Sequence, residues 1–238
     1  MRTLDWDGYP NCRDLGGLPT PDGPTRSGRI ARGPRRELLT TAGWARARSW
    51  GLRTVVDLRC AYEVVSRDGD PAPDPADLDG IEVIPSPVED HDNAEFRRTC
   101  FPILDSPEYW PHNLRILPDL VRRTLEAIAA AEPDILVHCS AGRDRTGLVT
   151  ALLLANAGVA PEVIADDYAQ SVEAIAGNWT NSPTADRQSG WGPAEVAYWL
   201  STTRPLVVAF AAGVDRHLAQ TGLGPPDRDR LRSLLLAD

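Results

Sequence analysis

The chain has 238 residues, of which 42% are hydrophobic, enough to bury a core. Its formal net charge of −9 argues against a general binder of nucleic acid or of anionic membranes. No apolar run approaches the ~18 residues that a membrane span needs, and the first residues lack the apolar segment of a signal peptide. We therefore expect a cytoplasmic protein with no integral membrane association.

The four cysteines form no C-x-x-C pair, which suits a reducing compartment and predicts no metal site. We expect no other cofactor either. All 25 basic residues are arginine, so an arginine at any single position carries little information.

The first 30 residues are polar and rich in turn formers. Residues 11–17 (N-C-R-D-L-G-G) alone predict a Gly-Gly turn between two short strands. Residues 37–50 then predict a helix that Gly51 ends. The next apolar run, residues 53–59, predicts a buried strand with a polar end.

Charged residues follow that strand. Asp57, Arg59 and Glu63 predict a buried ion-pair network that braces neighbouring loops, in preference to direct catalysis. Residues 66–80 contain three prolines and five aspartates and predict a surface loop. Residues 81–85 predict a third strand.

An acidic loop, residues 86–92 (S-P-V-E-D-H-D), leaves the third strand. Parallel strands end at one sheet edge, so this loop is expected beside any site there. We select Asp90 as a general acid, with Asp92 and Glu89 as alternatives; a merely solvated acidic loop is equally compatible with these residues.

Residues 96–105 give no clear pattern, whereas residues 113–131 show the apolar periodicity of a helix. The run I-L-V at residues 135–137 predicts a buried parallel strand, and residues 148–157 predict a helix. The loop between them therefore lies at a helix N terminus, where free amide groups and the helix dipole favour negative charge.

Cys139 begins this loop, in a setting that favours the nucleophilic thiolate. Five residues separate it from Arg145, whose guanidinium suits a phosphoryl group. Asp144 either acts on water or braces Arg145, and His138 orients the loop. Further ligand-binding candidates are Ser140, Ala141, Gly142, Arg143, Asp144 and Thr146.

Helices are also predicted over residues 162–175, 193–200, 205–218 and 226–236. Residues 177–192 fit either a mobile flap or an irregular connection. The predicted fold class is α/β, with a central, mostly parallel sheet of four or five strands, flanking helices and added C-terminal helices. We expect one domain, with a core over about residues 11–175 and a helical addition over about 193–238.

Residues 138–147 match the signature H-C-x-x-G-x-x-R-T-G, and residues 11–17, 57–63 (D-L-R-x-x-x-E) and 167–171 (D-Y-x-x-S) fit further short patterns. The chain thereby resembles the cysteine-dependent protein tyrosine phosphatase superfamily, and in particular the bacterial protein tyrosine phosphatase B-like family. In that pattern Cys12 replaces Phe, Arg143 replaces Lys, and Val88 stands where an Asp is expected.

The resemblance implies a tyrosine phosphatase fold and hydrolysis of phosphotyrosine in proteins or peptides, extending to phosphoserine, phosphothreonine or phosphoinositides, with inorganic phosphate as product. Arg13, Asp14 and Arg59 become supporting residues of such a site. Two other functions stay open: a phosphate-binding module without turnover, because of Val88, and a thiol-based reductase or sulfur transferase.

Overall fold

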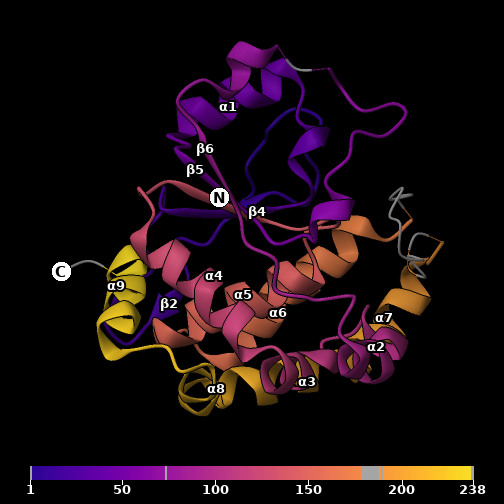
Figure 1. Cartoon of the computed structure of the whole chain (residues 1–238), viewed down its shortest axis with the longest axis vertical. Coiled ribbons are helices and arrows are strands. Elements are labelled where there is room, and N and C mark those ends of the chain that lie inside the picture. The colour runs from indigo at the N-terminus through magenta and orange to yellow at the C-terminus, as the bar shows by residue number, and fades with distance from the viewer. Residues whose placement is uncertain (1, 73, 178–187, 189, 237–238) are drawn as a thin grey trace.

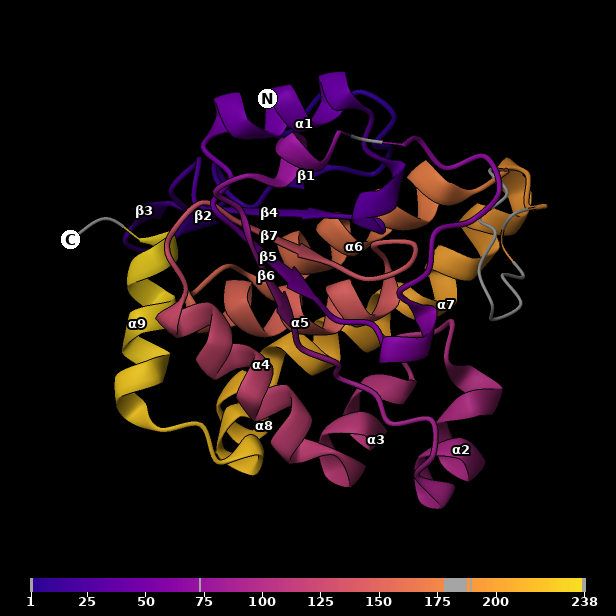
Figure 2. The ribbon, with the colours of Figure 1, turned by 45° about the horizontal axis from the view of Figure 1, so that its top comes forward.

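The computed structural model describes residues 2–72, 74–177, 188 and 190–236. Its main sheet has five strands in the order β1-β4-β7-β5-β6; Figure 1 labels β4, β5 and β6, and Figure 2 labels all five. Neighbours pair in parallel except for β1 with β4. The strands are β1 (Arg13–Asp14), β4 (Ile30–Gly33), β5 (Thr54–Asp57), β6 (Glu82–Pro85) and β7 (Ile135–His138), beside a hairpin of β2 (Pro19–Thr20) and β3 (Gly23–Pro24). The predicted fold class is confirmed.

The helices divide between the two faces of the sheet (Figure 2). Alternate strand residues explain this division: Val55 and Leu136 pack with Trp44 of α1, whereas Val56 and Val137 join the larger helical core. The helices are α1 (Thr41–Trp50), α2 (Ala94–Cys100), α3 (Tyr109–Ile116), α4 (Pro118–Ala130), α5 (Asp144–Asn156), α6 (Pro161–Ile175), α7 (Pro193–Ala212), α8 (Val214–Thr221) and α9 (Pro225–Leu235).

Two of the predicted helices differ from the structure as follows. Residues 37–50 begin with a short 3₁₀ turn, and α1 starts only after Thr40, whose hydroxyl accepts from the Gly43 amide at 3.0 Å. Residues 113–131 form two helices, because Pro118 disfavours the helical conformation at Leu117, which has φ −127° and ψ 46°.

The C-terminal prediction of a break near Pro205 is wrong. Helix α7 runs through this proline and ends at Ala212. The ring removes a hydrogen bond to the carbonyl of Ser201, and both residues lie on the exposed side of the helix, where solvent can replace that bond.

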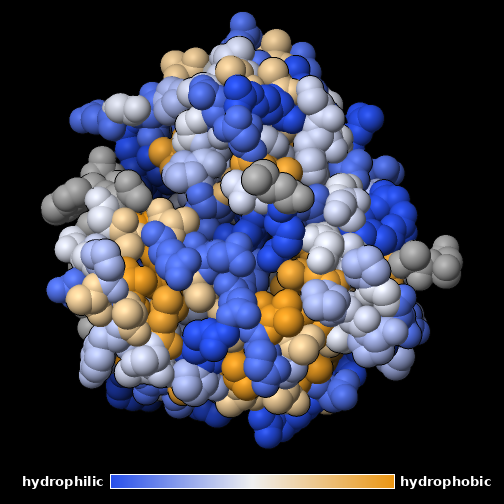
Figure 3. Space-filling view, turned by 180° about the vertical axis from the view of Figure 1, so that it is seen from behind, coloured by the Kyte–Doolittle hydropathy of each residue, from blue (hydrophilic) through white to orange (hydrophobic). Residues whose placement is uncertain are grey.

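The C-terminal helices share the larger core. Val207 and Phe210 of α7, Leu218 of α8 and Leu231 of α9 belong to the same buried cluster as α4 and α5. The back of the molecule shows apolar residues gathered mainly on its lower half and hydrophilic residues above them (Figure 3). Among the helices of the described residues, none combines the length and apolar character of a membrane span.

Candidate active site

Cys139 follows strand β7 directly and lies at the amino side of α5. All four residues of β7 are buried, between β4 and β5, so the strand that delivers Cys139 is held from both sides. Residues 139–145, the Cys139 loop, then turn into the helix. Gly142 has φ +71°, a conformation that favours glycine.

Three carbonyl groups of the Cys139 loop are bonded from outside the loop. The backbone amide of Arg35 donates to Ser140 O at 2.9 Å, Asn11 Nδ2 to Ala141 O at 3.0 Å, and Arg32 Nη2 to Gly142 O at 2.8 Å. In a trans peptide the N–H points opposite to the C=O. The outward carbonyls therefore turn the following amides towards the loop interior, as an anion site requires.

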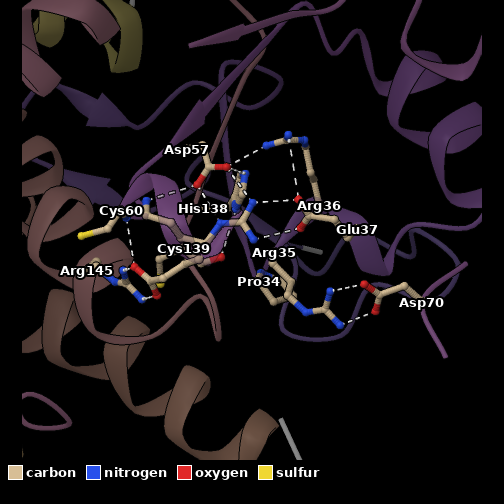
Figure 4. A network of polar contacts seen from close by, with 12 residues as sticks. Pro34, Arg35, Arg36, Glu37, Asp57, Cys60, Asp70, His138, Cys139 and Arg145 are labelled. Atoms are coloured by element: carbon tan, nitrogen blue, oxygen red, sulfur yellow. Dashed lines mark hydrogen bonds and ion pairs between the residues drawn. The ribbon is translucent and has the colours of Figure 1, made fainter. Parts of the chain in front are cut away.

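Arg145 lies in a network of polar contacts (Figure 4), in which carboxylates fix its guanidinium. Its two terminal nitrogens donate to the two carboxylate oxygens of Glu63, at 2.5 and 2.8 Å, and Glu89 Oε2 lies 3.6 Å from Arg145 Nη1. Burial alone would raise the pKa of Glu63, but its hydrogen bonds and charge pairing with Arg145 hold that pKa below the usual value. A buried ion-pair network is thus present, as predicted, but Glu63 pairs with Arg145 and not with Arg59.

The acidic loop brings Glu89 to the site. Glu89 is buried, and its Oε2 is 2.9 Å from His91 Nε2, while His91 Nδ1 bonds the hydroxyl of the exposed Tyr62. Asp90 is only half-buried, and its Oδ1 accepts from the amide of Asp92 at 3.0 Å. Of the three predicted acids, Glu89 is the one that the structure places against Arg145.

A second ion-pair network supports the strand end before Cys139. Arg59 donates to both oxygens of Asp57, at 2.9 and 2.7 Å, and to Glu37 at 3.0 and 2.8 Å. His138 is wholly buried; its Nδ1 is 3.0 Å from the carbonyl of Cys139 and its Nε2 is 3.6 Å from Asp57. Burial lowers the pKa of His138, so its ring is neutral near pH 7, in line with an orienting role.

Arg13 and Asp14 have different roles. Arg13 donates to Asp167 at 2.8 Å and to Asn11 Oδ1 at 2.8 Å, and Asn11 in turn holds the Cys139 loop. Asp14 instead accepts from the amides of Gly16 and Gly28, at 2.7 Å each, and from Trp50. Arg13 therefore supports the loop indirectly, whereas Asp14 stabilises the N-terminal turns.

The remaining loop side chains form two groups. Asp144 accepts from Arg143 Nε at 2.8 Å and from the Tyr168 hydroxyl at 3.2 Å. These bonds direct its carboxylate to α6. The hydroxyls of Ser140 and Thr146 are buried and have no hydrogen-bond partner among the described residues, which leaves both available to a ligand or to the Cys139 sulfur.

Sequence reasoning did not assign two side chains that hold the Cys139 loop. Asn11 donates to the carbonyl of Ala141, and Arg32 reaches the carbonyl of Gly142 from β4. Arg32 gave no signal because every basic residue of this chain is an arginine. Residues 177–192, for which either a mobile flap or an irregular connection was predicted, fall mostly outside the described residues.

Comparison with known proteins gives a matching family model and two similar proteins. A model of the tyrosine phosphatase family matches residues 4–237. The triple specificity protein phosphatase PtpB of Mycobacterium tuberculosis is 32% identical over 200 residues, covering 74% of this chain and 71% of that protein. A Cupriavidus necator protein provisionally named a tyrosine-protein phosphatase is 31% identical over 182 residues, covering 71% of this chain and 62% of that protein.

These comparisons cover the chain well beyond the signature, since the family model includes the C-terminal helices. The geometry of the site is in line with these comparisons: Cys139 is buried at a helix N terminus, inside a loop whose carbonyls are turned outward. The chain therefore belongs to the tyrosine phosphatase family, and the predicted resemblance, fold and enzyme class are confirmed.

Proposed function

We propose that the enzyme hydrolyses phosphotyrosine through a cysteinyl-phosphate formed on Cys139. The observation that carries this proposal is the pairing of a buried Cys139 with Arg145 across a loop whose carbonyls are bonded from outside. The inward amides and the guanidinium supply positive charge where the phosphoryl oxygens lie. Four free cysteines suit the reducing cytoplasm, where we place the enzyme.

The reaction has two steps. The Cys139 sulfur attacks phosphorus, the bond to the leaving oxygen breaks, and that oxygen takes a proton from a general acid. Water then attacks the cysteinyl-phosphate, gives its proton back to the same acid, and releases inorganic phosphate with the thiolate restored. Arg145 and the loop amides hold the equatorial oxygens in both steps.

Glu89 is the better placed proton donor. Its carboxylate lies 3.6 Å from Arg145 Nη1, and its Oε2 lies at hydrogen-bond distance, 2.9 Å, from His91 Nε2. Tyr62 continues this chain of hydrogen bonds to the surface. Asp90, our choice from the sequence, has its carboxylate engaged with the Asp92 amide. Asp90 stays a candidate that mutation can test.

Substrate breadth is part of the proposal. The name of the Mycobacterium relative includes triple specificity, and we extend this chain's substrates to phosphoserine, phosphothreonine and phosphoinositides. Arg143 would supply the extra cation for a second phosphate. We expect Arg143→Ala to lower hydrolysis of a phosphoinositide more than that of a phosphotyrosine peptide. Equal losses on both substrates would contradict this role.

Hydrolysis of p-nitrophenyl phosphate tests the activity itself. We expect turnover that Cys139→Ser abolishes and that orthovanadate inhibits. Binding of a phosphopeptide without turnover in the wild type would instead support a phosphate-binding module. Turnover of arsenate or of a sulfur donor, without phosphatase activity, would support thiol-based chemistry.

A further inference from the structure

The imidazole of His91, in the acidic loop, bridges two elements of the site. Its Nε2 lies 2.9 Å from Glu89 Oε2, and its Nδ1 forms a hydrogen bond with the hydroxyl of Tyr62, in the short turn after β5. Glu89 Oε2 is in turn 3.6 Å from Arg145 Nη1. An unbroken series of contacts therefore joins Tyr62 to the guanidinium at the end of the Cys139 loop.

Aromatic rings hold the imidazole in this position. Phe96, on α2, stacks on it with ring centroids 5.8 Å apart and an interplanar angle of 17°, and Phe101 meets it edge-on at 5.0 Å. The ring of Tyr62 lies 5.7 Å away, and the His91 side chain is only 10% exposed. Rotation of the ring would break these contacts, so His91 presents one fixed edge to Glu89.

The hydrogen-bond partners assign the tautomer of this ring. A carboxylate only accepts hydrogen bonds, so Nε2 carries the proton and donates to Glu89 Oε2. In the neutral ring the other nitrogen, Nδ1, then accepts. Desolvation of the hydroxyl and the charge of Glu63 raise the pKa of Tyr62 to about 12, so this hydroxyl keeps its proton and is the donor to Nδ1.

The two carboxyl oxygens of Glu89 have different surroundings. Oε2 faces the Nε2–H of His91 and the guanidinium of Arg145, which are both donors. Oε1 accepts no hydrogen bond from the described residues and is not fully enclosed, so it belongs to the small part of this side chain, 4%, that is exposed. A proton on Oε2 would point at two donors, whereas a proton on Oε1 meets neither.

We infer that His91 is a positioning residue, which holds Glu89 Oε2 and thereby keeps the proton of the general acid on Oε1, where the leaving oxygen can take it. The inference rests on the proposed function, because it concerns the acid of that reaction. In the first step the proton passes from Oε1 to the leaving oxygen as the bond from that oxygen to phosphorus breaks. In the second step water returns a proton to Oε1, and His91 keeps its own proton throughout.

Two substitutions separate the two nitrogens of His91. The amide nitrogen of asparagine takes the place of Nδ1 and that of glutamine the place of Nε2, so His91→Asn loses the bond to Glu89 and His91→Gln keeps it. We expect kcat on phenyl phosphate, whose leaving oxygen needs a proton, to fall about tenfold in His91→Asn and at most about threefold in His91→Gln. On p-nitrophenyl phosphate, whose leaving group needs little protonation, both variants should stay within about threefold of wild type. Equal losses on the two substrates in His91→Asn overturn the inference.

His112→Asn is the matched control, since it makes the same exchange on α3, outside this network, and it should alter neither rate. Tyr62→Phe serves where His91→Asn does not fold. Tyr62 is 56% exposed, so its hydroxyl can be removed without disturbing the core. Its loss releases Nδ1, and kcat on phenyl phosphate should fall about threefold relative to that on p-nitrophenyl phosphate. An unchanged ratio of the two rates in Tyr62→Phe overturns the inference.

A double-mutant cycle distinguishes failure of this inference from failure of the proposed function. If His91 acts through Glu89, His91→Asn should cost no further rate on phenyl phosphate in a Glu89→Gln background. A further loss of about tenfold in that background, or a wild-type rate in Glu89→Gln alone, overturns the inference and leaves the cysteinyl-phosphate mechanism intact. Turnover retained by Cys139→Ser would instead overturn the proposed function.

Discussion

Glu63 holds the two terminal nitrogens of Arg145 and is itself wholly buried. The pair joins the short turn after β5 to the first turn of α5, two elements 82 residues apart in the chain. Because Glu63 occupies the edge of the guanidinium between its two terminal nitrogens, the phosphoryl group must use the Nε–H side and the remaining N–H bonds. Arg145 is thus oriented before substrate arrives.

Glu63→Gln should therefore damage both activity and folding. Removing the charge leaves Arg145 buried with an incomplete partner, which costs about 3–5 kcal/mol when one member of a buried pair is removed. A misplaced guanidinium should lower kcat/KM about 100-fold. Urea unfolding and p-nitrophenyl phosphate kinetics measure the two effects.

The control for this variant is Glu95→Gln. Glu95 pairs with Arg115 at a similar distance, 2.8 Å, but both side chains are about half exposed. Neither stability nor kcat/KM should change measurably. An unaltered kcat/KM in Glu63→Gln would show that Arg145 does not depend on Glu63 for its position.

The identity of the general acid gives a second prediction. We expect Glu89→Gln to lower kcat on phenyl phosphate about 100-fold, because its poor leaving group needs protonation. The fall of kcat towards high pH should flatten, since the group that must be protonated is gone. The effect on p-nitrophenyl phosphate should be smaller.

Asp90→Asn is the matched comparison, in the same loop and with the same loss of charge. It should keep the wild-type pH profile and most of the rate. The reverse result, with a flattened profile in Asp90→Asn and a normal one in Glu89→Gln, would restore Asp90 as the acid.

The site was predictable from sequence where its residues are contiguous. Strand β7, the Cys139 loop and α5 follow one another, so an apolar run, a signature and a helical period located Cys139 and Arg145 together. Glu63 was recognisable as a buried ion-pair partner, but only tertiary structure shows that it selects Arg145 over Arg59. Such a choice depends on distances across the fold.

Tyr109 shows a different limit. A tyrosine at helical spacing is usually a core residue, and Tyr109 does lie in the core. Its buried hydroxyl has no hydrogen-bond partner among the described residues, a property that no sequence pattern encodes. The acidic loop does reach Arg145, but which of its carboxylates faces Arg145 depends on the conformation of the folded loop.

A third prediction concerns pH and stability. Asp167 pairs with Arg2, Arg13 and Arg32. Burial alone would raise the pKa of Asp167, but these arginines lower it far below the usual value. The folded protein therefore holds this carboxylate charged more strongly than the unfolded chain does, and the stability from the cluster is lost as pH falls below about 4.

Asp167→Asn should lower the free energy of unfolding by about 3–5 kcal/mol at pH 7. The difference from wild type should shrink as pH falls from 5 to 3, as urea unfolding at each pH would show. The neighbouring Asp166→Asn, which alters an exposed pair with Arg204, should leave this pH dependence unchanged. A constant difference across that range would exclude Asp167 as a source of acid sensitivity.

A fourth prediction separates backbone strain from steric contact in the Cys139 loop. Gly142 and Gly17 have similar conformations, with φ +71° and +78°. A Cβ at Gly142 would lie 2.4 Å from the carbonyl oxygen of Gly33, whereas a Cβ at Gly17 would meet nothing within 4 Å. Alanine at either position carries the strain of a left-handed residue, about 1–2 kcal/mol.

Gly142→Ala must in addition push the Cys139 loop away from β4. The carbonyl of Gly142 would then lose its bond from Arg32, and the amides beside it would turn from the ligand. We expect kcat/KM to fall at least 100-fold in Gly142→Ala and to stay within about twofold in Gly17→Ala. Phosphate-induced thermal shifts should disappear in the first variant and persist in the second. Equal kinetics in the two variants would mean that close packing against Gly33 does not shape the loop.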